Sequence, residues 1–425
     1  MRGSSRGPVS WTRVVVPCRG NVAPPRLVSG MSIRTDSPQF VALITALIAL
    51  GSLSTGIYLP SMPSIGRHFA VDADVVQVTL TAFLAGFALA QLALGPLSDR
   101  FGRRPVLLAG LAIYLVATLA CAAAPSIDWL IGARFVQAVG ACAPQIVSRA
   151  MIRDSFERER AARVMSIIGM AFALIPPLGP LVGGKLEVLF GWQSTFLAVG
   201  ALGAVLATVV ALRLGETNRQ LDPSALVPTH MLRNYGTLAR DRIYLGYALA
   251  VAATFGGLFA YLTGAPFVFI SLLGVPPDQF GYLSLTNVLG YIAGAIVNNR
   301  MVARVGSPTM ARIGMSLIAA SGVAMTGAAL LGYFSIPSII GPFMLFMAGL
   351  AMTMPNAMAG ALSRHPRMAG AASALLGFLQ MASATGASYA VSHVHGPSQM
   401  PMVGVFTVMT LAGMLLPMLL VGRRG

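Results

Sequence analysis

The chain has 425 residues, of which 56% are apolar and only 10% charged, and its formal net charge is +16. A water-soluble protein of this length could not cover so much apolar surface, so the composition indicates that lipid surrounds much of the chain. Its basic residues follow a membrane topology rather than a binding patch, and we therefore expect no nucleic-acid partner.

The N-terminal stretch, 1–38, is rich in Arg, Pro, Gly and Ser and has no apolar core of the kind that a signal peptide contains. This composition predicts a disordered tail. Nothing before Met31 has an expected structural use, so both Met1 and Met31 are candidates for the true start.

Twelve apolar segments follow, each close to the roughly 20 residues that a helix needs to cross a bilayer. An even number places both termini on one side, and the arginine-rich connections mark that side as cytoplasmic. Apart from Arg67, Arg134 and Lys185, every Lys and Arg falls on this side. The predicted segments are 39–60, 76–96, 105–124, 129–150, 163–185, 192–212, 243–265, 280–299, 309–331, 337–360, 369–391 and 401–421.

The longest connection, 213–242, carries several arginines and is predicted to be a cytoplasmic linker. It separates an N-terminal bundle, 39–212, from a C-terminal bundle, 243–425. The stretch from Arg304 to Pro308 faintly repeats the loop that follows the second segment, at the equivalent place in its half. The sequence therefore predicts an all-α membrane protein of twelve transmembrane helices in two six-helix bundles.

The loop between the second and third segments is short, glycine-containing and strongly charged, which predicts antiparallel neighbouring helices. Its pattern G-x-x-x-D-R-x-G-R-R resembles the loop 2–3 signature of the major facilitator superfamily of transporters. That resemblance implies two bundles with a substrate path between them. Topology does not require the acid, which is expected to lie at a helix N-terminus or to pair with the nearby arginines, latching the cytoplasmic side. The residues of this motif are Gly95, Asp99, Arg100, Gly102, Arg103 and Arg104.

Arg134 lies in the fourth segment, and an arginine there is costly unless it snorkels to the interface or faces a polar cavity. Gln137 is three residues further on and shares its face of the helix. The pattern R-x-x-Q-x-x-G resembles the segment-four motif of drug–proton antiporters. The resemblance implies that Arg134 interacts with the substrate or with a proton-carrying partner, and a snorkelling arginine is the alternative.

The fifth segment contains closely spaced glycines and prolines, which let helix backbones approach and bend. The run resembles the G-P-x-x-G-G motif of antiporters. We expect it to form a packing face that acts as a hinge or a leak-tight seam. Its residues are Gly179, Pro180, Gly183 and Gly184.

The first segment ends in Y-L-P-S-x-P, beginning at Tyr58, which resembles the bicyclomycin and chloramphenicol resistance (Bcr/CflA) branch of drug–proton antiporters. In that branch the residue two before the tyrosine is usually an aspartate, the natural partner of the segment-four arginine. This chain has Gly56 instead, and Glu187 is the acid that comes closest to a predicted membrane interior. A proton carrier is commonly a carboxylate or a histidine, so the sequence predicts a transporter body without an evident proton site.

Three explanations remain open. Glu187 reaches Arg134 and takes over proton coupling, the protein is an uncoupled facilitator, or Arg134 holds an anionic substrate directly. We favour retained efflux with altered coupling. Further polar residues within apolar helices are candidates for the substrate path, although each can equally hold helices together. They are Tyr58, Tyr261, Asn287, Asn356 and Gln380.

Two groups of polar residues receive no role in transport. His365 is predicted to be a solvated loop histidine, and the charged residues from Arg149 to Arg160 are predicted to form a solvated loop cluster. The sequence also contains no CxxC, HExxH or phosphate-binding glycine loop, so we expect no catalytic residue, metal or cofactor.

We predict a monomeric multi-pass transporter of the bacterial cytoplasmic membrane, with both termini in the cytoplasm and protons as the coupling ion. It exports small amphipathic drugs or metabolites by alternating access. One rival keeps the fold but makes the protein a facilitator or importer of a small organic anion bound by Arg134. The other rival is a non-transporting membrane protein.

Overall fold

The computed structural model describes residues 33, 37–218, 221–223, 228–365, 368–394 and 398–421. Both candidate start residues lie outside these ranges, and so does the predicted tail apart from residues 33, 37 and 38. All regular secondary structure in the described part of the chain is helical.

Twelve helices of 19 residues or more occur in the described residues and follow the predicted segments, which confirms the all-α fold. Ten helices there are long and apolar enough to cross a membrane, and the long helices α6 and α13 complete the twelve. The twelve are α1 (Pro38–Gly56), α3 (Ala73–Phe101), α4 (Arg103–Ala122), α5 (Ile127–Ser155), α6 (Arg158–Phe190), α7 (Gln193–Arg213), α9 (Arg242–Pro266), α10 (Pro277–Val305), α11 (Ser307–Leu330), α12 (Ile336–Ser363), α13 (Ala369–His393) and α14 (Met400–Val421).

Short helical elements occupy some of the predicted connections. A 3₁₀ turn, η1 (Leu59–Ser61), and α2 (Met62–Phe69) follow α1, and a π-helical turn, η2 (Phe267–Leu272), follows α9. The linker between the halves contains α8 (Pro228–Arg240), which packs on α9 and α13.

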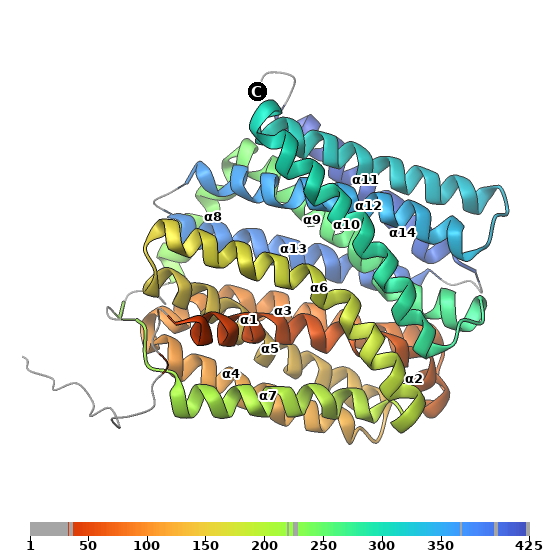
Figure 1. Ribbon diagram of the computed structural model, residues 1–425, viewed down its shortest axis with the longest axis horizontal. Coiled ribbons are helices and arrows are strands. Elements are labelled where there is room, and N and C mark those ends of the chain that lie inside the picture. The colour runs from red at the N-terminus through yellow and green to blue at the C-terminus, as the bar shows by residue number, and fades with distance from the viewer. Residues whose placement is uncertain are drawn as a thin grey trace, which may run out of the picture.

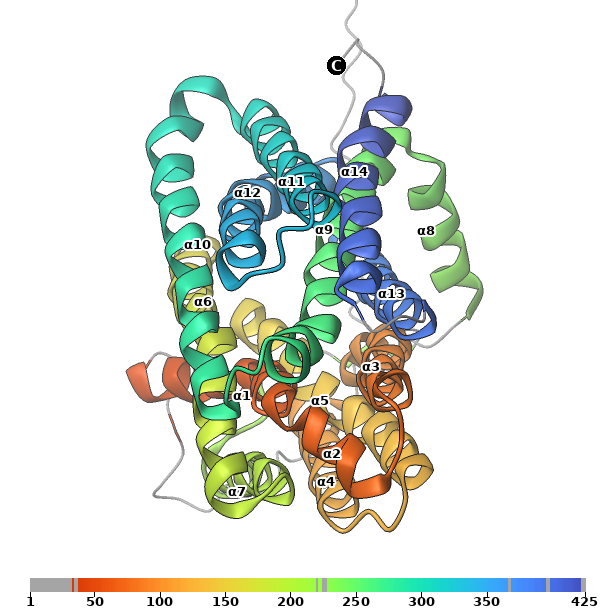
Figure 2. The ribbon, with the colours of Figure 1, turned by 90° about the vertical axis from the view of Figure 1, so that its right-hand side faces the viewer.

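The long helices form two groups, which Figures 1 and 2 show from the side and from one end. Helices α1 and α3 to α7 pack mainly on one another, and so do α9 to α14. Two helix pairs join the groups, because α3 runs beside α13 and α6 runs beside α10. Contact between the halves is therefore concentrated along two seams.

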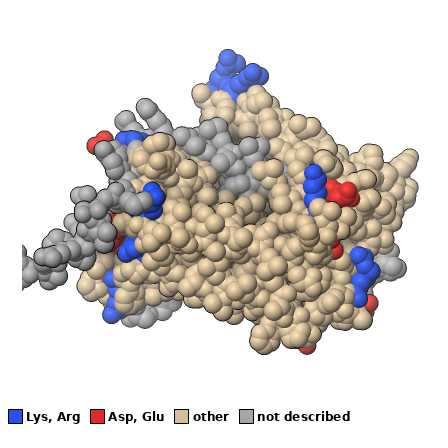
Figure 3. Space-filling model, turned by 60° about the horizontal axis from the view of Figure 1, so that its bottom comes forward, with Lys and Arg blue, Asp and Glu red and all other residues tan. Residues whose placement is uncertain are grey.

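The two ends of the bundle differ in charge. We call one the basic end, where the connecting residues 102, 156–157, 241, 306 and 364–365 lie, and the opposite one the far end. Figure 3 shows one face of the molecule, on which charged side chains gather toward the ends and leave a broad uncharged band between them. Such a band is what a hydrocarbon environment requires.

Buried apolar side chains form one shared cluster toward the far end and separate clusters toward the basic end. The shared cluster joins Tyr58 and Leu84 of the first half with Phe259, Phe343 and other residues of the second. Toward the basic end, one cluster of buried residues belongs to the first half and another to the second. Among the described residues, the buried apolar cluster that both halves share therefore lies toward the far end, and Met381 of α13 also packs against the cluster of the first half.

Small residues set the distance between α6 and α10 at the far end. A Cβ atom on Gly281 would lie 2.7 Å from the Leu181 nitrogen and 3.0 Å from the Pro180 carbonyl carbon. A Cβ atom on Gly184 would in turn overlap the carbonyl of Pro277. Glycine at these positions is therefore what lets the two backbones touch.

We expect Gly281→Val to destabilise the protein by about 1–3 kcal/mol, because the added side chain forces α10 away from α6. The apparent melting temperature of the detergent-purified protein measures this loss. Gly386→Val is the control, since a Cβ atom at Gly386 would meet nothing within 4 Å. Equal melting temperatures for the two variants would show that the close approach of α6 and α10 is not required.

Candidate functional site

Arg134 is fully buried on α5 and its guanidinium lies among aromatic rings. The guanidinium carbon is 4.3 Å from the ring centre of Phe83, 4.6 Å from that of Tyr58 and 5.8 Å from that of Phe196. We call these three residues the aromatic box. They come from α3, the turn after α1, and α7, so every ring of the box belongs to the first half.

Hydrogen bonds fix one edge of the guanidinium. Its Nη1 donates to Gln137 Oε1 at 2.7 Å, as the spacing of the two residues predicts, and to the Ser54 carbonyl at 3.4 Å. Gln137 Nε2 donates to the Thr118 hydroxyl at 2.8 Å, which fixes the orientation of the amide. All of these partners are electrically neutral.

No carboxylate of the described residues forms an ion pair with Arg134, and its Nε and Nη2 atoms are buried without a hydrogen-bond partner. Glu187 lies near the far end of α6 and also keeps a buried, partnerless carboxylate oxygen. The proposed pairing of Glu187 with Arg134 is therefore not formed in this conformation. The snorkelling alternative is wrong, because the arginine side chain is 0% exposed.

The glycine motif of α6 packs against the end of α1. Helix α1 ends at Gly56, and a Cβ atom on Gly179 would lie 2.8 Å from the Gly56 carbonyl carbon. A Cβ atom on Gly183 would overlap the carbonyl oxygen of Ile57. Pro180, also buried, borders the contact with Gly281 on α10. The motif therefore joins the end of α1 to the seam between the halves.

The polar candidates of the second half fall into separate places. Tyr261 stacks on Phe343, with ring centres 3.4 Å apart, whereas Asn287 on α10 is buried and its Oδ1 atom has no hydrogen-bond partner among the described residues. Asn356 instead donates to Asn298 Oδ1 at 2.7 Å, a partner that the sequence reading missed.

Gln380 lies on α13, partly buried, in neither of these groups. The structure thus brings Tyr58 and Gln137 to Arg134, but it does not gather all the predicted polar residues at one point.

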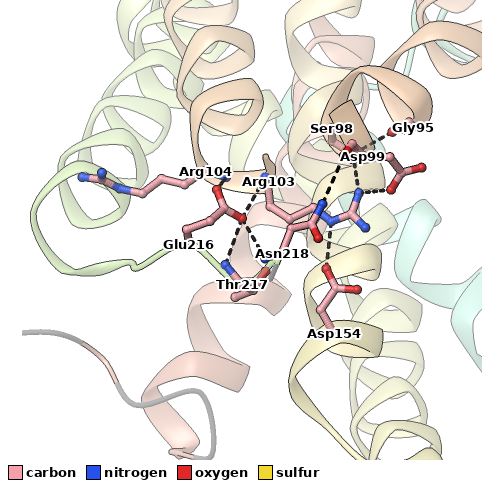
Figure 4. A network of polar contacts seen from close by, with 9 residues as sticks. All are labelled: Gly95, Ser98, Asp99, Arg103, Arg104, Asp154, Glu216, Thr217 and Asn218. Atoms are coloured by element: carbon pink, nitrogen blue, oxygen red, sulfur yellow. Dashed lines mark hydrogen bonds and ion pairs between the residues drawn. The ribbon is translucent and has the colours of Figure 1, made fainter. Parts of the chain in front are cut away.

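At the basic end, the charged loop after α3 is held by ion pairs (Figure 4). Arg103 Nε lies 2.8 Å from Asp154 Oδ2 on α5, and Arg103 Nη1 lies 2.5 Å from Asp99 Oδ1. The turn passes through Gly102, whose φ of 97° favours glycine. Of the two expected partners for Asp99, an arginine is therefore the one observed, and all these contacts lie within the first half.

The remaining motif residues are less involved. Arg100 lies over the ring of its neighbour Phe101 at 5.4 Å, and a Cβ atom on Gly95 would meet nothing within 4 Å. Arg104 donates through Nη2 to the Ala211 carbonyl at 2.7 Å, at the end of α7. A cation beside the last carbonyl groups of a helix is favourable.

Glu216, which the sequence reading did not select, caps the N-terminus of α4. Its two carboxylate oxygens accept hydrogen bonds from the backbone N–H groups of Arg103 and Arg104, each at 3.0 Å. The same carboxylate accepts from the backbone of Thr217 and Asn218. An acid at this position satisfies the free N–H groups of the first turn and complements the helix dipole. The start of the linker is thereby tied to the charged loop.

A second polar network holds the basic end of the second half. Asp241, which precedes α9, accepts from His365 Nε2 at 2.9 Å, from Arg364 Nε at 3.2 Å and from the Ile243 N–H at 2.9 Å. His365 is thus partly buried and bonded, and the prediction of a solvated loop histidine is wrong. Burial alone would raise the pKa of Asp241, but the hydrogen bonds, first among them the one from His365, lower it below 3.8.

Arg149 also differs from its prediction. The residue belongs to α5, which continues to Ser155, and it is half-buried rather than part of a loop. The loop proper is short, because α6 already begins at Arg158. The predicted charged cluster is therefore divided between the ends of two long helices.

Comparison with known proteins gives a family match and a set of relatives. Residues 44–388 match the model of the Major Facilitator Superfamily. The chain is 35% identical to a "Bicyclomycin resistance protein homolog" of Haemophilus influenzae, over 81% of this chain and 86% of the relative. It is 32% identical to a "Chloramphenicol resistance protein" of Pseudomonas aeruginosa (79% of each chain) and 28% identical to "Multidrug resistance protein D" of Escherichia coli (82% and 86%).

Solved structures show the same fold. The partially occluded inward open conformation of the xylose transporter XylE from E. coli superimposes with a TM-score of 0.71, covering 91% of this chain and 98% of that one. The two sequences are 14% identical, so this likeness concerns the fold alone.

We expect Glu216→Ala to lower the free energy of unfolding by about 1 kcal/mol, because two backbone N–H groups at the start of α4 lose their acceptor. The apparent melting temperature of the purified protein measures the change. Asp72→Ala is the matched control, because Asp72 precedes α3 without forming a side-chain cap bond. An equal effect of both substitutions would mean that the cap contributes nothing specific.

The Asp241 network predicts a pH dependence. A carboxyl group whose pKa is lowered on folding stabilises the folded state above its ordinary value of 3.8, and this contribution disappears as the pH falls through the lower, folded value. Asp241→Asn should therefore melt at a lower temperature than the wild type at neutral pH, with the gap narrowing below pH 3.8. Melting curves across the pH range provide the test, with Asp72→Asn as a control for charge removal elsewhere. A gap that stays constant with pH would contradict the role of this carboxylate.

Proposed function

Because this chain belongs to the major facilitator superfamily and is a multi-pass membrane transporter, we propose that it exports small amphipathic drugs or metabolites across the bacterial cytoplasmic membrane. Three relatives, each aligned over about four fifths of this chain, are named for resistance to bicyclomycin, chloramphenicol or multiple drugs. Their names support a drug-like substrate class for this chain. The basic end faces the cytoplasm, since positive residues accumulate on that side of membrane proteins.

The arrangement of the apolar clusters is the observation that best supports alternating access. The halves share a core toward the far end and have separate cores toward the basic end. Such an arrangement closes a path at the far end while leaving the halves free to separate at the basic end. In this proposal the structure represents an inward-facing state, and rocking of the halves exchanges it for an outward-facing one.

The seams between the halves suit such rocking. On the α3–α13 seam, the hydroxyls of Thr81 and Ser388 are 2.8 Å apart. The side-chain amide of Gln91 occupies the space that a side chain at position 377 would need, and that residue is a glycine. On the α6–α10 seam, glycines meet backbone directly. Small side chains with few directional bonds allow helices to slide without breaking strong interactions.

Protons are the proposed coupling ion, but not through an acid beside Arg134, where this chain has Gly56. Glu187 supports this part of the proposal, because one of its carboxylate oxygens is buried without a partner near the far end. Carboxylates commonly act as acids and bases in proteins, and we assign the coupling role to Glu187. We further propose a monomer with both termini in the cytoplasm.

Transport by the purified protein in proteoliposomes tests this function. With chloramphenicol, bicyclomycin and a fluorescent amphipathic dye as probes, we expect accumulation that requires an imposed pH gradient and stops when an ionophore collapses it. Arg134→Met should reduce accumulation to background, because it removes the charge at the centre of the aromatic box. Arg67→Met, which alters an exposed arginine at the far end, should still transport.

Two results would count against the proposal. Equal flux with and without the gradient would indicate a facilitator. No flux of any compound in a panel of antimicrobials, from protein that melts like a folded sample, would indicate a membrane protein without transport activity.

A further inference from the structure

The guanidinium of Arg134 carries a full positive charge in the interior of the first bundle, where it is 0% exposed. Transferring an ionised group out of water is strongly unfavourable even after the protein relaxes around it, unless an opposite charge compensates. Cation–π contacts with the aromatic box are weaker than this desolvation penalty. The rings and the neutral acceptors that surround the charge therefore do not balance it.

The other polar groups nearby are neutral and already engaged. The Tyr58 hydroxyl lies 2.5 Å from the Thr79 hydroxyl, and the Tyr114 hydroxyl lies 2.7 Å from that of Ser54. The thiol of Cys121 faces Gln137 Oε1 at 3.9 Å. None of these groups is an acid at neutral pH. The described part of the structure thus holds Arg134 without a counter-charge.

Two donors of the guanidinium remain unused. The Nη1 edge is taken up by Gln137 and the Ser54 carbonyl, whereas Nε and Nη2 are buried and unpartnered. The N–H groups of Nε and Nη2 lie along one side of the planar guanidinium and point in parallel. This is the edge with which arginine binds a carboxylate through two hydrogen bonds.

We propose that a small, singly charged anion binds to the Nε–Nη2 edge of Arg134 and supplies the missing counter-charge. Two sources have this chemistry: inorganic chloride, and the carboxylate of a transported molecule. Anion binding at Arg134 matters for transport only if the proposed function holds, and in that respect this inference rests on it. Binding is measured without transport, so that either proposal can fail without the other.

Thermal unfolding of the detergent-purified protein in sodium isethionate tests the proposal. Chloride or acetate then replaces isethionate at constant ionic strength. A ligand that binds only the folded protein raises its stability with a saturating dependence on concentration. We expect such a rise in melting temperature for the wild type and none for Arg134→Met. Arg67→Met, which removes an exposed arginine, should respond like the wild type.

Gln137→Glu provides a variant that keeps the shape of the site. Gln137 Oε1 already lies 2.7 Å from Arg134 Nη1, so this substitution places a carboxylate against the guanidinium. With an internal counter-charge present, we expect the response to added anions to be lost. This variant keeps the proposal testable if Arg134→Met does not fold.

Equilibrium dialysis with radiolabelled chloride measures binding directly. A response to chloride, with one chloride bound per wild-type chain and none to Arg134→Met or Gln137→Glu, supports the inorganic anion. A response confined to acetate supports a substrate carboxylate. A wild type that responds to neither anion, or that responds no more than Arg134→Met, overturns the proposal.

Discussion

A guanidinium that is buried inside a bundle of membrane-spanning helices cannot reach water, so its partners have to come from the protein. In this chain Arg134 draws them from four directions: α5 supplies Gln137, the end of α1 supplies Ser54 and Tyr58, and α3 and α7 supply aromatic rings. Helix α4 joins through the Thr118 hydroxyl on Gln137. The packing of the first half thus encloses a buried charge that it hydrogen-bonds along one edge, as well as burying apolar surface, and this charge restricts how its helices can be arranged.

The position of this charge also links it to the contact between the halves. Tyr58 reaches the guanidinium only because α1 stops at Gly56 and the chain turns there. Gly179 and Gly183 of α6 pack against the same turn, and their neighbours Pro180 and Leu181 contact α10. Any displacement of α6 along its seam therefore acts on the backbone that carries Tyr58. This contiguous contact is a physical route by which occupancy at Arg134 and the arrangement of the halves can affect each other.

The sequence was sufficient to predict the helices and the unusual charge, because both follow from hydropathy along the chain. Twelve apolar segments predict the twelve long helices, and Arg134 stands out because it lies within one of these segments. Contacts made by the connections were not predictable in this way. Glu216 and His365 lie in connections, where no periodicity indicates which helix end they meet. Asn298 was missed because a polar residue near a helix end is expected to face water, whereas Asn356 from α12 meets it here.

Charged networks at the basic end and the shared apolar core at the far end have different structural roles. At the basic end, the network around Arg103 and Glu216 stays within the first half and the start of the linker, and the network around Asp241 stays within the second. Among the described residues neither network joins one half to the other, so charged hydrogen bonds stiffen each half without locking the two together. Apart from the hydrogen bond between Thr81 and Ser388, the described contacts between the halves are mainly those of apolar side chains and glycines, whose attraction has no fixed direction. Rigid halves joined mainly by such contacts can tilt against each other without losing a specific ion pair, and alternating access requires this property.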